Sequence, residues 1–204
     1  YFMPRLLAAF SRRHPGVNAS LDITNREALL KQLNDNAVDL VVMGQPPPEM
    51  DLDAGMFMDN PLVIIGPPSH PLARMKRIPL ARLQDEVFLV RERGSGTGIA
   101  MERFFTERGM RLRTGMEVGS NEAINRRVEA GLGRGLMSPQ AVEMEVRLKR
   151  LVILAVEKFP LMRHWYVVHR RGKRLSPAAA AFKQYLLTET PREKKQTKGR
   201  AAKS

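Results

Sequence analysis

Apolar and polar positions alternate along most of the chain in blocks that switch between the period of a helix and that of a strand. The blocks predict helices at 3–13, 24–33, 98–109, 120–131, 139–148 and 175–187, and strands at 17–23, 38–44, 52–58, 61–68, 86–91, 115–119, 135–138, 151–156 and 164–170. A linker with a short helix is expected between the two halves, at 69–84.

Two helix starts carry clear local signals. Thr24 precedes a helical pattern and Glu27 follows three residues later, which is a capping-box arrangement. Ser176 and Pro177 predict the N-cap and the first turn of the last helix.

Strands and helices alternate twice, and a proline-rich stretch follows the first alternation, which predicts an α/β fold of two lobes. Each lobe is expected to hold a mostly parallel sheet flanked by helices. We assign residues 1–73 and 161–189 to lobe 1 and residues 74–160 to lobe 2, with the late strand and the last helix returning to lobe 1.

Ligands of such sheets bind beyond the carboxyl ends of the strands. Short hydroxyl residues stand at these junctions, where each can also serve only as a helix cap, and two arginines flank the turn "GSGTG" and can clamp an anion. The candidate effector-binding residues are Thr24, Asn25, Arg91, Arg93, Ser95, Gly96, Thr97, Ser120, Asn121 and Glu122.

The residue patterns do not predict catalysis. The turn "GSGTG" lacks the Gly-Lys-Ser/Thr ending of a nucleotide-hydrolysing loop, and its glycines have the wrong spacing for a dinucleotide fingerprint. Ser95 is not in a nucleophile elbow, the histidines lack metal-ligand spacing, and there is no cysteine. We therefore expect a binding protein that needs no cofactor and no metal, and not an enzyme.

The positive charge of the chain indicates an acidic partner, either a nucleic acid or an anionic ligand. The formal net charge is +13, of which residues 1–189 carry +8 and residues 190–204 the rest. The tail has no apolar residue beyond alanine, so we expect it to be disordered. It is either a solubilising terminus or a nucleic-acid arm.

No apolar run is long enough to cross a bilayer, and a cysteine-free chain without a signal peptide fits the cytoplasm.

Several motifs, in order, resemble the effector-binding domain of LysR-type transcriptional regulators. They are "PRLLAAFSRRHPGV", "NREALLKQLNDNAVDLVVMGQPP", "FLVRERGSGTGIAMERFF", "GSNEAINRRVEAGLG" and "RHWYVVHRRGKRLSPAAAAF". The resemblance covers about residues 1–188 and is greatest to the CbbR group, which controls operons for carbon fixation.

The resemblance implies a type 2 periplasmic-binding-protein-like fold that binds a metabolite between its lobes. The implied effectors are ribulose bisphosphate, phosphoenolpyruvate, NADPH or ATP. The implied partners are DNA, read by an N-terminal helix-turn-helix that this sequence lacks, and further copies of the chain in a homodimer or homotetramer. It also implies a first strand of lobe 1 before Tyr1, so a gap is expected in that sheet. Arg93, Gly98 and Arg134 depart from the usual pattern, and we expect positive charge to be kept near the cleft.

Two alternatives belong to other functional classes. An exported solute-binding protein would share the fold and deliver a small acid to a transporter. An α/β enzyme acting on a phosphorylated metabolite would need a carboxylate, a lysine or a metal in the cleft, which no motif indicates.

Overall fold

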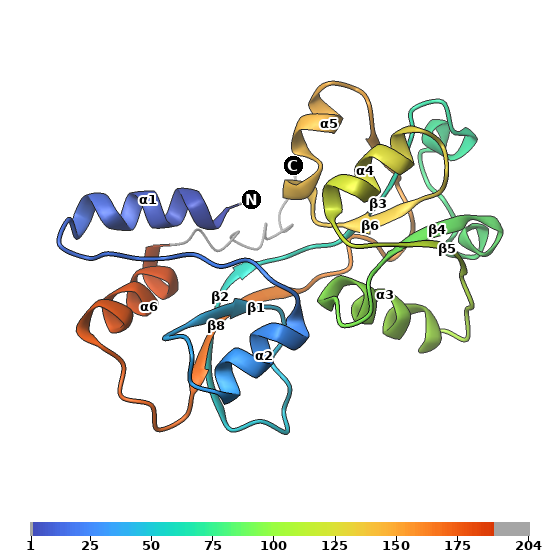
Figure 1. Cartoon of the computed structure of the whole chain (residues 1–204). Helices are drawn as coiled ribbons and strands as arrows, with labels where there is room; N and C mark the ends of the chain where they lie inside the picture. The colour runs from blue at the N-terminus through green and yellow to red at the C-terminus, as the bar shows by residue number, and fades with distance from the viewer. Residues whose placement is uncertain (1, 190–204) are drawn as a thin grey trace, which may run out of the picture.

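The computed structural model describes residues 2–189 and has two lobes joined by two crossing segments (Figure 1). The predicted disordered tail, 190–204, lies outside the described residues. Among residues 2–189, no helix is both long and apolar enough to span a membrane.

Lobe 1 is built on a sheet with the strand order β1-β8-β2, in which β8 runs antiparallel to both neighbours. Helices α1 and α6 lie together on one side, and α2 packs beside β1 and β8 (Figure 1). Its elements are α1 (Met3–Arg13), α2 (Arg26–Asn34), β1 (Val41–Met43), β2 (Leu52–Asp59), β8 (His164–Arg170) and α6 (Pro177–Glu189).

Lobe 2 contains a sheet with the order β6-β3-β7 and a parallel pair, β4-β5. Arg134, just before β6, joins the pair to this sheet: its carbonyl accepts from the Leu89 N–H (2.9 Å) and its N–H donates to the Val87 carbonyl (2.7 Å). Its strands are β3 (Val63–Gly66), β4 (Val87–Arg91), β5 (Arg113–Val118), β6 (Gly135–Met137) and β7 (Val152–Ile153). Its helices are η1 (Pro71–Arg74), η2 (Leu80–Asp85), α3 (Gly96–Thr106), α4 (Asn121–Glu129), η3 (Pro139–Ala141) and α5 (Glu143–Arg147).

The chain crosses between the lobes earlier than the sequence-based boundary at residue 73. Strand β3 pairs with β6 and β7, so it belongs to lobe 2. The crossings lie at 60–62 and 161–163, where the Asn60 N–H donates to the Arg163 carbonyl (2.7 Å). Leu62 and Leu161 exchange two further backbone hydrogen bonds of 2.9 Å. The linker expected at 69–84, which suggested the later boundary, lies within lobe 2 and contains η1 and η2.

The strand directions also differ from the expected mostly parallel sheets. Among the named strand pairs, β4-β5 alone is parallel. The reason is connectivity: β8 arrives from lobe 2 through the second crossing and enters between β1 and β2 in the opposite direction.

Residues 17–23 do not form the predicted strand. They run without a ladder partner among the described residues, with Leu21 42% and Ile23 80% exposed. A strand requires backbone partners as well as an apolar pattern. An open groove runs between this segment and β1, which is where the resemblance predicts a gap in the sheet.

The two lobes have separate apolar cores. In lobe 2, Phe88, Phe104 and Phe105 pack with Ile64 and Leu136 between the sheet and α3. Lobe 1 is smaller, with Leu33, Val41 and Val168 buried under α2 and a second cluster around Phe57 under α6. The crossings are therefore narrow bridges between two independently packed bodies.

Candidate functional site

A groove of about 750 Å³ begins where the lobes meet and continues along β1. At the junction it is lined by α2 and the end of β1 in lobe 1, by the start of α3 in lobe 2, and by both crossing segments. Seven predicted residues line it: Thr24, Asn25, Arg91, Ser95, Gly96, Thr97 and Asn121. The fold therefore brings most of the predicted set to one groove.

The other three predicted residues, Arg93, Ser120 and Glu122, are not among the groove's lining residues. Arg93 is exposed, and its backbone N–H bonds to Glu117 Oε1 (3.2 Å). Ser120 is the N-cap of α4 and accepts from the Ala123 N–H (3.1 Å). Glu122 is exposed in the first turn of that helix. Sequence position placed them at a strand end, but their side chains face elsewhere.

The N-terminus of α3 is presented to the groove by a glycine turn. Ser95 is 6% exposed and caps the helix, its Oγ accepting from the Thr97 N–H (3.3 Å). Gly94 has φ +84°, a conformation that strongly favours glycine. A Cβ at Gly94 would lie 3.5 Å from Glu27 Oε2, so this turn approaches α2 of the other lobe. The first turn of α3 thus brings its N-terminal end, with the positive charge of the helix dipole, to the junction.

Arg91 is already paired and does not offer the expected free clamp. Its Nε and Nη2 donate to the two carboxylate oxygens of Glu92 (2.7 and 2.8 Å). Its Nη1 donates to Asn121 Oδ1 (2.8 Å). Hydrogen bonding from Arg91 is the main cause that lowers the pKa of Glu92 below its ordinary value. Arg91 therefore holds Asn121 at the groove while its charge is neutralised.

Two other arginines supply the positive charge, and both escaped the sequence analysis. Arg163, in the second crossing, points to the junction: its Nη2 would lie 2.6 Å from a Cβ at Gly44 and 3.5 Å from one at Gly96. Its Nη1 is buried and has no hydrogen-bond partner among the described residues. Burial, and secondarily the nearby charge of Arg26, lowers the pKa of Arg163.

Arg26 opens α2 and donates through Nη1 to the Gln45 carbonyl (2.8 Å). Burial is the main cause that lowers its pKa, against the opposing field of Glu49. Arg26 and Arg163 therefore place two guanidinium groups at one junction, beside the N-termini of α2 and α3. This arrangement stabilises an anion.

The helix cap beside Arg26 is one residue later than predicted. Asn25, and not Thr24, is the N-cap of α2, because its Oδ1 accepts from the Ala28 N–H (3.0 Å). Thr24 is exposed at the edge of the groove.

Arg134, expected near the cleft, lies inside lobe 2 and is 6% exposed. Its Nε is 3.0 Å from Glu86 Oε2 without making a hydrogen bond, and its Nη1 donates to the Gly133 carbonyl. The charge of Arg134 is therefore paired with Glu86 and does not contribute to the groove.

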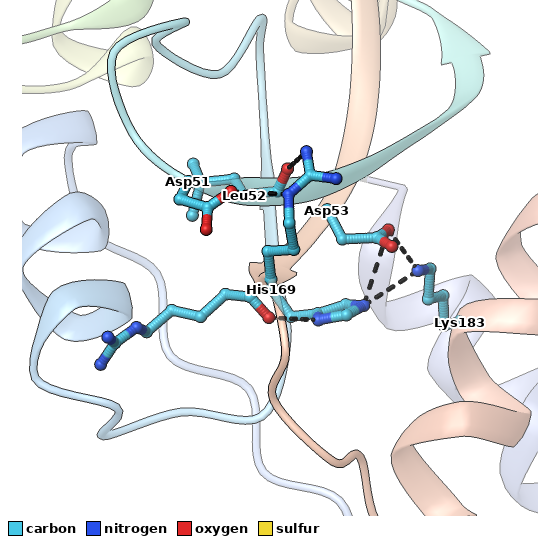
Figure 2. A network of polar contacts seen from close by, with 7 residues as sticks. Asp51, Leu52, Asp53, His169 and Lys183 are labelled. Carbon is cyan, nitrogen blue, oxygen red and sulfur yellow. Dashed lines mark hydrogen bonds and ion pairs between the residues drawn. The ribbon is translucent and has the colours of Figure 1, made fainter.

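A second polar cluster lies in lobe 1 and does not line the groove (Figure 2). Lys183 of α6 donates to Asp53 Oδ1 (2.6 Å) and lies 2.9 Å from His169 Nε2. His169 Nδ1 is 2.9 Å from the Arg170 carbonyl, which can only accept, so Nε2 is left to accept from Lys183. The hydrogen bond from Lys183 is the main cause that lowers the pKa of Asp53. This cluster ties α6 to β2 and β8.

Comparison with known proteins gives this groove a family context. The LysR substrate binding domain matches residues 1–191. The "RuBisCO operon transcriptional regulator" of Allochromatium vinosum is 54% identical over 94% of this chain and 64% of its own length. The regulator of the same description from Acidithiobacillus ferrooxidans is 47% identical over 91% of this chain and 60% of its own length. The chain thus spans less than two thirds of these relatives.

A solved structure has the same architecture. The regulatory domain of Synechocystis PCC6803 CcmR, in complex with 2-PG, superposes with a TM-score of 0.89 at 40% identity, covering 93% of this chain and 91% of that one. The effector-binding domain of QuiR, in complex with shikimate, has the same fold at 20% identity and a TM-score of 0.84. The two-lobed, type 2 periplasmic-binding-protein-like architecture predicted from the sequence is confirmed. By sequence and by fold, this chain belongs to the LysR substrate-binding-domain family.

Proposed function

We propose that this chain is the effector-sensing domain of a transcriptional regulator of carbon-fixation genes and that it binds a small anionic metabolite between its lobes. One observation carries the ligand class: the guanidinium of Arg163 lies at the lobe junction, and its buried Nη1 finds no hydrogen-bond partner within residues 2–189. The names of the relatives, regulators of the RuBisCO operon, support the biological role over that of an exported solute-binding protein.

The geometry supports a mechanism based on the relative position of the lobes. An anion at the junction touches α2 from lobe 1 and α3 from lobe 2 at once, so it prefers the arrangement that brings both helix ends to it. A difference of about 1–3 kcal/mol between the two arrangements is enough for a regulatory switch. The domain needs no catalytic step for this role.

The proposal extends to partners. The candidate effectors are ribulose bisphosphate, phosphoenolpyruvate, NADPH and ATP, to which the complex of CcmR adds 2-PG. DNA would be bound by a part of the regulator outside this chain, within a homodimer or homotetramer. A regulator that acts on bacterial DNA works in the cytoplasm.

A thermal melt of the chain with each candidate effector, and with inorganic phosphate, tests the proposal. A ligand at 100 times its Kd adds about 2.7 kcal/mol to the free energy of unfolding and raises Tm by several degrees. We expect one or two metabolites to raise Tm well beyond phosphate. If a cooperative melt is unmoved by every anion in the panel, the proposed ligand class is wrong.

A further inference from the structure

The two crossing segments carry a pair of unsatisfied polar atoms. Asn60 in the first crossing is 3% exposed, and its Oδ1 has no hydrogen-bond partner among the described residues. The buried Nη1 of Arg163, in the second crossing, also has no hydrogen-bond partner within residues 2–189. The Asn60 N–H bonds to the Arg163 carbonyl (2.7 Å), so the two residues are neighbours, and both line the groove. Buried polar groups are nearly always paired, so two exceptions at one place call for an explanation.

The chemistry of the two atoms is complementary to one kind of molecule. A guanidinium only donates, and it binds carboxylate or phosphoryl oxygens. The amide oxygen of Asn60 only accepts, and it requires a ligand group that donates, such as a hydroxyl. An ion pair between the two residues is impossible, because the amide is neutral.

Gly44 leaves room for the guanidinium, and Gly96 lies beside it. A Cβ at Gly44 would come within 2.6 Å of Arg163 Nη2, and one at Gly96 within 3.5 Å. Gly44 directly follows β1 in lobe 1, and Gly96 is the first residue of α3 in lobe 2. The side chain of Arg163 thus extends from a crossing segment to a point where both lobes touch it.

We propose that the crossing segments themselves form a ligand subsite, in which Arg163 binds the anionic group of the effector and Asn60 accepts a hydrogen bond from a hydroxyl of the same molecule. This inference rests on the proposed function and narrows it to hydroxylated anions, such as sugar phosphates and hydroxy-acid phosphates. It also means that the ligand acts on the hinge directly, because both contacts come from the residues that join the lobes.

The test compares two ligands that differ in the hydroxyl. 3-Phosphoglycerate carries a carboxylate, a phosphate and a hydroxyl, whereas phosphoenolpyruvate carries the two anionic groups alone. Isothermal titration of the chain with both is repeated on Asn60→Ala and Arg163→Gln. Arg77→Gln serves as the control, because the Arg77 side chain is 82% exposed, pairs with Glu157 and does not line the groove.

We expect Asn60→Ala to weaken binding of 3-phosphoglycerate about five- to tenfold, the usual effect of one neutral hydrogen bond, and that of phosphoenolpyruvate less than twofold. Arg163→Gln should weaken both ligands at least tenfold, and Arg163→Lys should restore part of the loss for both. Arg77→Gln should bind both as the unmodified chain does.

A further variant guards against a folding defect in Arg163→Gln. In Gly44→Ala the new methyl group collides only with the flexible end of Arg163, so the guanidinium moves while the charge stays. This variant should melt close to the unmodified chain and still lose affinity for both ligands.

The outcomes separate this inference from the proposed function. If the chain binds either anion but Asn60→Ala and Arg163→Gln bind it equally well, the subsite is wrong and the sensing role stands. If Asn60→Ala weakens both ligands equally, the amide does not recognise a hydroxyl and the narrowed ligand class is overturned. If neither 3-phosphoglycerate nor phosphoenolpyruvate binds the unmodified chain while another anion of the thermal-melt panel does, the narrowed ligand class is overturned and the sensing role stands; if no anion of either set binds, both proposals fail.

Discussion

Arg91 and Arg163 both line the groove but, among the described residues, the charge of Arg91 is neutralised by a neighbouring carboxylate and that of Arg163 is not. Arg91 is bonded to both oxygens of Glu92, so it contributes shape and orientation but little charge. Arg163 has no acidic partner within the described ion pairs and is desolvated. A ligand therefore meets the charge of Arg163 and the polar surface held by Arg91.

The cap of α2 gives a prediction at the scale of single residues. Asn25→Ala removes the acceptor for the Ala28 N–H, so we expect a loss of about 1 kcal/mol in the free energy of unfolding, measured by urea denaturation followed through Trp165 fluorescence. Thr24→Ala is the matched control and should cost only a few tenths, because Thr24 makes no cap. Equal losses in the two variants would contradict the assignment of Asn25 as the cap, and a larger loss in Thr24→Ala would indicate that Thr24 is the cap.

Residue type predicts three serine caps of this chain, although the cap of α2 is Asn25 and not the predicted Thr24, whereas the arginines that supply the charge of the site were not predicted. Ser95, Ser120 and Ser176 each accept from an N–H two or three residues later, a local relation that residue type alone reveals. Arg163 lies far along the chain from Gly44 and Gly96, and only the return of the chain through the second crossing brings them together. No local pattern distinguishes it from the other arginines.

At the scale of elements, β8 is the central strand of lobe 1, with β1 on one side and β2 on the other. The cluster of Asp53, His169 and Lys183 ties α6 to this sheet (Figure 2). Most α-helices were predicted closely because each has its own period, and several have a side-chain cap. The helix expected at 139–148 is instead divided into η3 and the five-residue α5, neither of which has a side-chain cap. The extent and partners of the strands were not, because ladder hydrogen bonds depend on residues far away in the sequence.

The pKa of Asp53 gives a prediction for this cluster. Because the folded-state pKa lies below the ordinary value of 3.8, the carboxylate stabilises the fold above pH 3.8, and this contribution is lost as the pH falls through the folded-state pKa. Asp53→Asn should therefore be less stable than the unmodified chain at pH 7, and the gap in urea-unfolding free energy should shrink below pH 4.

Asp51→Asn is the control for this measurement. Asp51 lies two residues before Asp53, immediately ahead of β2. Its side chain forms an ion pair with Arg171 and is 78% exposed. Such exposed pairs contribute little, so this substitution should change stability by less than about 0.5 kcal/mol at any pH. A gap for Asp53→Asn that stays constant from pH 7 to pH 3 would contradict the role of the ionised carboxylate.

At the scale of the whole molecule, two packed lobes are joined by the crossings at 60–62 and 161–163. Three backbone hydrogen bonds hold these segments together, donated by Asn60, Leu62 and Leu161. The two-lobed plan follows from the double alternation in the sequence. The position of the crossings could not be predicted in this way. The sequence of β3 fits the last strand of lobe 1 as well as a strand of lobe 2, and only its pairing with β6 and β7 decides between them.

Hydrogen exchange at these three amides tests the crossing segments as a hinge. If these crossings are the hinge, their amides exchange when the lobes move, so saturating effector should slow that exchange, by up to about a hundredfold at 100 times Kd. The amides of Val167 and Val168, in the middle of β8, should change much less. Unchanged exchange at Asn60, Leu62 and Leu161 in a domain shown to bind effector would exclude these crossings as the moving part.

The crowding of Arg26 and Arg163 at the junction has a practical consequence for work on the unliganded domain. Two guanidinium groups beside two helix N-termini repel one another when the groove holds only water, and that repulsion is relieved by any oxyanion small enough to enter. We therefore expect sulfate and phosphate in a buffer to occupy the groove weakly, whereas chloride at the same ionic strength should only screen the charges. The arrangement of the lobes measured without a metabolite should then depend on the salt in which the domain is prepared.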